Sequence, residues 1–437
     1  MNTKRHPDIK EALRYWIVLG FISFGGPAGQ MSIMFNELVE KKRWISESRF
    51  LHALNFCMLL PGPEAIQLAI YIGWLLHGTW GGLLAGIFFI LPSAIIFWIL
   101  SYIYVLYGTV PVIASIFYGL KPAVMAIVFM ASFRIGKRIL KNKVLWTISA
   151  LSFLSIFFLQ IPFPLIIISA AAIGFAGGYF LKDKFYVLQD ITLKSDQPQS
   201  VIHDDLETPS HARPSFKKNM KIILVSLTAW WTPVFSMGFW RGWDSVHFQE
   251  GLFFSKAAMV TFGGAYAVLT YVAQQSVEYY QWLEPGQMID GLGLAEATPG
   301  PLIMVLQFVG FLGGWNYPDD LNPLASATLG ALVTTWVTFV PCFLWIFLGA
   351  PYIEKLRGNE RLITTLTAVT AAVVGVIFNL AVWFGLHVLF PDQDGFDFFA
   401  LSISVVTFVG MCRFNWGIVP VIFGSGLVGV IYKWLFA

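Results

Sequence analysis

The chain has 437 residues, of which 57% are hydrophobic, 16% aromatic and only 12% charged. Soluble domains carry about 25% charged residues, so this composition excludes a string of ordinary soluble domains. The formal net charge of +3 gives no indication of nucleic-acid binding.

Apolar runs recur along nearly the whole chain, and a transmembrane helix needs about 20 such residues. Their glycine, proline and aromatic content is typical of membrane helices, whereas a barrel would show alternating segments of about 10 residues. We therefore predict an all-α, polytopic integral membrane protein. The runs cover 12–35, 50–76, 80–107, 110–135, 144–160, 162–181, 222–240, 252–273, 287–313, 324–350, 362–390, 397–411 and 414–436.

Helix-breaking residues interrupt the first two runs. Phe24-Gly25-Gly26-Pro27 lies inside 12–35, and Pro61-Gly62-Pro63 lies inside 50–76. Broken backbone at membrane depth is tolerated only where protein or a water-filled cavity satisfies its polar groups. Runs that turn back at these breaks would also keep the basic segment 41–49 in the cytoplasm. We therefore favour broken or re-entrant helices over uninterrupted spans.

Two ionisable residues lie within the apolar runs of the first half. Lys121 is near the middle of 110–135, where a cation costs roughly 2.5–3.5 kcal/mol, so it should face an anion or a carboxylate. Glu64 directly follows Pro63. It either complements a helix N-terminus or exchanges a proton during transport, and the sequence leaves both readings open.

A polar stretch from 182 to 221 predicts a flexible cytoplasmic linker between membrane domains at 1–181 and 222–437. Basic residues gather in the N-terminus, the loop 134–143 and this linker, which places all three in the cytoplasm. The run 222–240 then crosses once, so the second half should start outside. The loops of the second half agree with this orientation. Segments 314–322 and 391–397 hold acids without Lys or Arg and suit the outside, whereas 351–361 is basic and suits the inside.

The landmarks of the first half recur in the second. Phe24-Gly25-Gly26 returns as Phe262-Gly263-Gly264, and Pro61-Gly62-Pro63 returns as Pro299-Gly300-Pro301, both 238 positions later. Trp44 returns as Trp282 at the same offset, and Pro92 matches Pro341 at an offset of 249. Two copies in opposite orientation form the inverted repeat of many secondary transporters.

Matching breaks in both halves predict where a ligand binds. A half-helix N-terminus offers free N–H groups and a positive dipole end to an anion. Glu64 and Glu296, which flank the breaks, are candidates for proton coupling. The alternative is that the breaks are packing kinks and that polar side chains, Gln307 among them, join helices. The predicted binding set is Gly25, Gly26, Pro27, Asn55, Pro61, Gly62, Pro63, Gln67, Lys121, Gly263, Gly264, Thr298, Pro299, Gly300 and Pro301.

Catalytic and cofactor motifs are missing from the sequence. The seven histidines and three cysteines show no metal-ligand spacing, and no nucleotide-binding GxxxxGK[ST] or catalytic HExxH or GxSxG pattern occurs. We therefore expect neither a cofactor nor a metal, and we do not expect an enzyme.

With these residues in place, the chain resembles the chromate ion transporter family in its long two-repeat form. The resemblance rests on Phe24-Gly25-Gly26-Pro27, on the stretch Leu60–Trp74, on Thr261–Val268 and on Thr298-Pro299-Gly300-Pro301. It implies a bacterial inner-membrane protein that exports chromate, driven by the membrane potential or a proton gradient, and so confers chromate resistance. Sulfate is a close mimic because both ions are tetrahedral dianions. A sulfate uptake transporter and an uncoupled anion channel remain the alternatives. The expected partners are the oxyanion, protons and the lipid bilayer, with no nucleic acid, and oligomeric state is left open.

Overall fold

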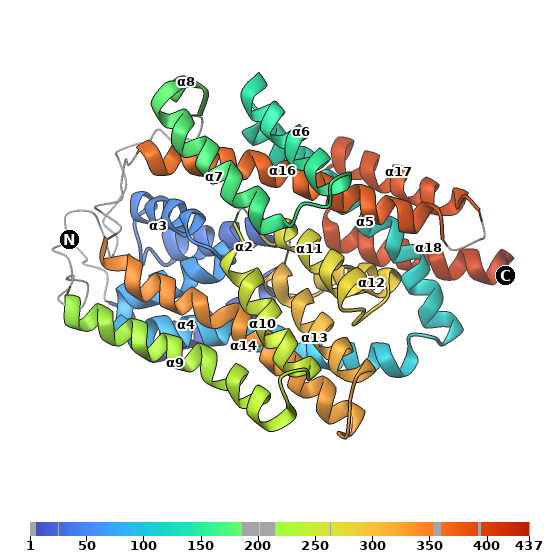
Figure 1. Ribbon diagram of the computed structural model, residues 1–437, viewed down its shortest axis with the longest axis horizontal. Helices are drawn as coiled ribbons and strands as arrows, with labels where there is room; N and C mark the ends of the chain where they lie inside the picture. The colour runs from blue at the N-terminus through green and yellow to red at the C-terminus, as the bar shows by residue number, and fades with distance from the viewer. Residues whose placement is uncertain are drawn as a thin grey trace.

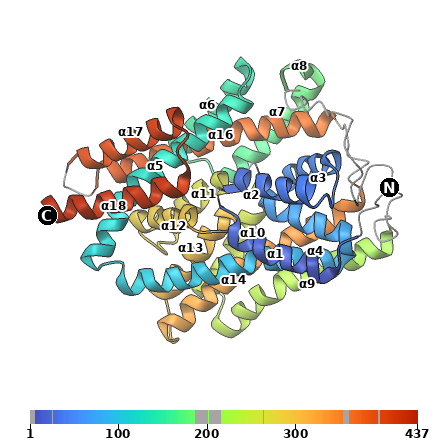
Figure 2. The same cartoon turned by 180° about the vertical axis from the view of Figure 1, so that it is seen from behind.

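A computed structural model describes residues 6–24, 26–185, 201, 215–262, 264–352, 360–391 and 395–436. The all-α prediction is confirmed, because these residues form helices joined by turns and include no β-strand (Figures 1 and 2). In both views the helices drawn in yellow occupy the middle of the molecule. They come from the second half and are packed among helices of the first.

The first half contains seven long helices, with a π-helical turn (Asn36–Lys41) after the second, and the short α8 (Lys182–Phe185) follows them. They are α1 (Ile9–Ile22), α2 (Gly26–Phe35), α3 (Glu47–Leu59), α4 (Glu64–Tyr107), α5 (Pro111–Ile139), α6 (Lys143–Phe157) and α7 (Phe163–Phe180).

The second half begins with α9 (Phe216–Arg241) and then repeats the same order, including a π-helical turn (Gln275–Tyr279). Its helices are α10 (Val246–Met259), α11 (Ala265–Gln274), α12 (Pro285–Ala297), the 3₁₀ turn η4 (Leu302–Met304), α13 (Val305–Asn316), α14 (Pro323–Gly349), the 3₁₀ turn η5 (Ala350–Tyr352), α16 (Glu360–Leu389), α17 (Phe398–Arg413) and α18 (Ile418–Phe436).

The internal repeat extends to the backbone conformation. Residues with positive φ occupy matching places in the two halves. The pairs are Gly26 and Gly264, Arg43 and Gln281, and Gly62 and Gly300, with φ values of 65° and 101°, 53° and 54°, and 122° and 114°. Helix α9 has no counterpart in the first half, so it is the element that separates the two copies.

Within the described ranges, seven helices are long and apolar enough to cross a membrane, which makes this a multi-pass membrane protein. They are Glu64–Tyr107, Pro111–Ile139, Phe163–Phe180, Phe216–Arg241, Pro323–Tyr352, Arg361–Leu389 and Ile418–Phe436. The segments on either side of the predicted breaks are shorter, apart from α4, whose chain reverses direction within its length. At 1.5 Å per residue, α1 with its 14 residues extends about 21 Å, less than the roughly 30 Å of a bilayer core. The prediction of broken helices is therefore confirmed.

Helix α4 is a hairpin of two helices. Its backbone leaves helical geometry at His77 and Gly78, where φ is −133° and 63°. Residues before and after this turn pack side by side, since a methyl group built on Gly86 would lie 2.8 Å from Cγ1 of Ile70. The second half uses a loop between α13 and α14 at this place. That longer loop accounts for the change in repeat offset from 238 to 249.

The predicted linker 182–221 falls only partly within the described residues. Its beginning forms α8 and its last residues belong to α9, while 186–200 and 202–214 lie outside the described ranges. The boundaries of the two membrane domains stay a prediction.

Candidate transport site at the junction of the two repeats

Each Pro-Gly-Pro loop docks on the other repeat. The N–H of Gly62 donates a hydrogen bond of 2.7 Å to the carbonyl of Thr261, and the N–H of Gly300 donates one of 2.8 Å to the carbonyl of Ser23. Ser23 and Thr261 occupy the same repeat position, at the end of the helix before each Gly-Gly break. The two bonds are therefore related by the pseudo-symmetry of the fold, and they bring all four breaks to one place.

Glycine and proline have different structural roles in these loops. Gly62 and Gly300 adopt positive φ, which only glycine adopts without strain. Pro63 and Pro301 then fix φ at −70° and −64° and act as N-caps of the next helical segments. Neither cap supplies a side-chain hydrogen bond. The helix ends that follow thus present backbone N–H groups, as an anion-binding terminus does.

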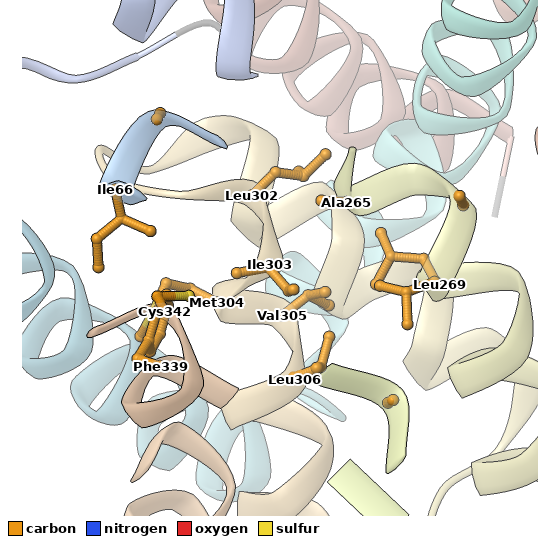
Figure 3. Packing of buried hydrophobic residues seen from close by; sticks show 14 of the residues in the cluster. Ile66, Ala265, Leu269, Leu302, Ile303, Met304, Val305, Leu306, Phe339 and Cys342 are labelled. Atoms are coloured by element: carbon orange, nitrogen blue, oxygen red, sulfur yellow. The ribbon is translucent and has the colours of Figure 1, made fainter. Parts of the chain in front are cut away.

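The centre is closed by apolar side chains. The turn from Leu302 to Leu306 packs with Ile66, Ala265, Leu269, Phe339 and Cys342, all of them buried (Figure 3). Gly62, Pro63, Gly300 and Pro301 are buried as well, whereas Pro61, Thr298 and Pro299 are half-buried. The glycine and second proline of each loop are therefore covered by protein in this conformation, while the first proline is partly exposed.

Polar side chains from the first half reach the breaks. Glu64 is 8% exposed and its Oε2 has no hydrogen-bond partner among the described residues. Its Oε1 faces the opposite repeat, because a methyl group built on Gly264 would lie 4.0 Å away. Gln67 donates to the carbonyl of Pro61 at 2.8 Å. Gln30 donates to the carbonyl of Gly300 at 2.6 Å, a contact that sequence reasoning missed.

The polar side chains of the second half mostly donate or accept hydrogen bonds within the protein. Tyr266 donates a hydrogen bond to buried Glu296. Thr298 donates to the carbonyl of Leu294 at 2.9 Å, and Gln307 donates to the carbonyl of Ala94 at 2.8 Å. Gln307 therefore joins helices in this conformation, which is the alternative that its sequence position left open.

Three further members of the predicted set lie at the edges of this region or beyond it. Gly26 and Pro27 begin α2 and are half-buried, and Asn55 on α3 is exposed. Gly25 and Gly263 lie outside the described residues, so their predicted role stays a prediction.

Lys121 is paired with a carboxylate. Its Nζ lies 3.6 Å from Oδ2 of Asp290, which also accepts a 2.9 Å hydrogen bond from the hydroxyl of Tyr104. The side chains of Lys121 and Asp290 are 31% and 6% exposed. Sequence reasoning missed Asp290, although an acid inside the apolar run 287–313 was a usable signal. Six residues of α12 separate Asp290 from Glu296, a rise of about 9 Å.

A basic pocket of about 430 Å³ opens at the C-terminal end of α5. Arg134, Lys137, Arg138 and Lys141 line it together with Met130, Phe133, Met411, Cys412 and Asn415. Arg134 acts electrostatically on Tyr266, the partner of Glu296, so this pocket lies next to the central region. Among the described residues, no three His, Cys, Asp or Glu side chains are grouped to hold a metal ion.

Comparison with known proteins agrees with the extent of the repeat. The family model described as "Chromate transporter" matches residues 10–175 and 248–430, and leaves out the linker and α9. The chain is 27% identical over 426 residues to the "Chromate transport protein" of Cupriavidus metallidurans, covering 97% of this chain and 93% of the relative. It is 30% identical over 370 residues to the "Chromate transport protein" of Pseudomonas aeruginosa, covering 83% and 77%. A "Probable chromate transport protein" of Synechococcus elongatus is 27% identical over 383 residues, covering 87% and 86%. No solved structure matches this chain.

Proposed function

Because this chain belongs to the chromate transporter family, we propose that it is a secondary transporter that exports chromate across the bacterial inner membrane and so confers chromate resistance. The observation that carries this proposal is the meeting of four interrupted helices, two from each repeat, at the centre of a multi-pass protein. Interrupted helices at a repeat interface are the usual construction of a substrate site in secondary transporters.

The reciprocal docking of the loops suits alternating access. The contact of Gly62 with Thr261 and that of Gly300 with Ser23 are two separate bonds at equivalent positions of the two repeats. Release of one contact while the other is kept would open the centre toward one side of the membrane only. The closed apolar packing around Leu302–Leu306 corresponds to the state between the two openings.

The charges along α5 suit an anionic substrate. The basic pocket lies at the end that the positive-inside rule assigns to the cytoplasm, and Lys121 lies beyond the centre on the same helix. We propose that chromate is captured in this pocket, passes Arg134 to the break at Thr298–Pro301, and leaves past Lys121. A route in this order favours export over uptake.

Glu64 and Glu296 are the proposed proton carriers at the centre. Both are buried beside the breaks, and an ionised carboxylate there would repel a dianion. Binding of the substrate would therefore be linked to protonation of these groups, which would couple transport to the proton gradient.

Chromate uptake into everted membrane vesicles tests the proposal. We expect uptake that requires this protein and an imposed gradient, and that sulfate inhibits because of its shape. Absence of protein-dependent chromate uptake with the gradient intact would reject export. Sulfate transport without chromate transport would favour a sulfate transporter, and ion conductance independent of any gradient coupling would favour a channel.

A further inference from the structure

Glu250, on α10, is a buried carboxyl group outside the central site. It is 0% exposed, and both of its oxygens lack a hydrogen-bond partner among the described residues. Glycines make room for it, since a methyl group built on Gly330 would lie 2.8 Å from Oε2, and one built on Gly313 would collide with Oε1. The carboxyl group is thus held in a space that α13 and α14 leave open for it.

Two other polar side chains, each with an atom that lacks a partner within the described part of the chain, lie one helical turn from Glu250 and from Gly330 respectively. The hydroxyl of Thr334 and Nδ1 of His247 are both buried and unpaired among the described residues. His247 precedes Glu250 by one helical turn, and its Nε2 lies 3.0 Å from the carbonyl oxygen of Ser326. We call His247, Glu250, Ser326 and Thr334 the Glu250 cluster. Unpaired buried polar groups are rare in folded proteins, so a carboxyl group with both oxygens unpaired among the described residues calls for a ligand.

Charged groups lie at one end of the Glu250 cluster. Arg241, at the end of α9, contacts Asp320 at 2.5 Å and Asp319 at 3.8 Å, and both Arg241 and Asp319 act electrostatically on His247. The hydrogen bond from Arg241 holds the pKa of Asp320 below its usual range. This contact is therefore intact at neutral pH, and it is lost only as the pH falls through the lowered value.

The remaining elements packed on α10 bring few titratable groups. Tyr271 on α11, and Tyr280 after it, pack against Phe253, one turn beyond Glu250. Described residues of α13 and α14 contribute no acid, base or histidine to this contact. Among the described residues, His247 thus lies one helical turn from Glu250 and within electrostatic reach of Arg241 and Asp319.

The repeat shows that packing does not require a carboxyl group here. At the 238-residue offset, Ala12 of α1 takes the place of Glu250. The aromatic packing one turn beyond is alike, since Tyr15 meets Trp44 edge to face at 5.5 Å, and Phe253 meets Trp282 in the same way at 5.7 Å. An unpaired ionised carboxylate in a protein interior costs several kcal/mol, so its retention in one repeat alone points to a function.

We propose that Glu250 binds and releases a proton through His247, at a site separate from the central oxyanion site. A proton satisfies a lone buried carboxylate, and protonation changes occur inside membranes at residues of this kind. The role of this site in driving transport rests on the proposed function, whereas proton binding itself does not.

Infrared spectroscopy of the purified protein tests proton binding without any transport. The difference between wild type and Glu250→Gln should contain the stretching band of a protonated carboxyl group at neutral pH, and this band should shift in D₂O. The His247→Gln variant should slow the shift. Absence of the band, or a band that never shifts, would overturn the proposal, because an inert buried acid keeps its proton.

Flux in vesicles tests the role in coupling. Glu250→Gln should lower accumulation driven by the proton gradient about tenfold and leave exchange of labelled for unlabelled chromate intact, as expected of an intramembrane proton carrier. The matched control is Glu278→Gln, an exposed acid in the same half that bonds to Trp383. Unchanged gradient-driven accumulation in Glu250→Gln would refute the coupling role. If wild type moves no chromate in either assay, the proposed function fails and the infrared result alone decides on the site.

Discussion

At the residue scale, Lys121 can have two roles, as the counter-ion of Asp290 and as a contact for the anion. Its ammonium group lies beside Asp290 while its side chain is still 31% exposed, so it can attract a passing anion as well. Lys121→Ala should abolish chromate flux and also destabilise the protein, because an unpaired buried charge costs about 3–5 kcal/mol. Flux in vesicles and the thermal stability of the purified protein measure the two effects.

A double variant separates these effects. Lys121→Met combined with Asp290→Asn leaves no charge to neutralise, so stability should recover relative to Lys121→Ala. If the ammonium group contacts the oxyanion, flux stays absent in the double variant. Recovery of both stability and flux would show that Lys121 acts only as the counter-ion of Asp290.

Arg134 should matter more to substrate capture than the other cations of the basic pocket. It is the one that acts on Tyr266, whereas Lys141 at the mouth already bonds to the carbonyl of Lys137 at 3.0 Å. Arg134→Gln should raise the chromate concentration for half-maximal flux about tenfold, the equivalent of about 1.4 kcal/mol, with a smaller rise for Lys141→Gln. Equal effects of Arg134→Gln and Lys141→Gln would indicate that the pocket attracts chromate through its overall positive charge and not along a defined route.

At the element scale, the Pro-Gly-Pro loops depend on backbone conformation. Gly62→Ala introduces a side chain at a φ of 122° and places its methyl group 3.0 Å from Sγ of Cys342. Non-glycine residues in such regions cost about 1–3 kcal/mol, so flux and stability should both fall. Gly300→Ala should behave alike, because its methyl group meets Ser93, which matches Cys342 in the repeat. Gly424→Ala on α18 is the control, since its methyl group meets nothing within 4 Å. If Gly62→Ala changed neither flux nor stability, this account would be contradicted.

Sequence reasoning found the elements better than their contacts. Proline and glycine inside apolar runs located the breaks at Gly26, Gly62 and Gly300, because helix-breaking chemistry is local. The reversal at Gly78 falls in the gap between the predicted runs 50–76 and 80–107, so the sequence also separated the two arms of α4. The docking of Gly62 on Thr261 and the pairing of Lys121 with Asp290 were missed. Both join residues more than 150 positions apart, and no local pattern specifies such contacts.

At the scale of the whole molecule, α9 decides how the two repeats relate to the membrane. Each repeat contributes the same series of long helices, and among the long described helices α9 has no counterpart. If each repeat crosses an even number of times, the single crossing of α9 places the second copy in the opposite orientation. The distribution of Lys and Arg predicts this arrangement from sequence, but the contacts within the protein do not depend on which side faces the cytoplasm.

Matched positions in the two copies test the inversion. His6 precedes α1 and Asp244 precedes α10, each is exposed, and they are 238 residues apart. In a chain with Cys57, Cys342 and Cys412 replaced by alanine, an impermeant maleimide added to intact cells should label Asp244→Cys and spare His6→Cys. Everted vesicles should give the reverse pattern, because the lipid bilayer blocks a charged reagent. Labelling of both positions from one face would mean that the copies are parallel. The proposed export route, which starts at the basic pocket and leaves past Lys121, would then lose the inverted-repeat arrangement on which it rests.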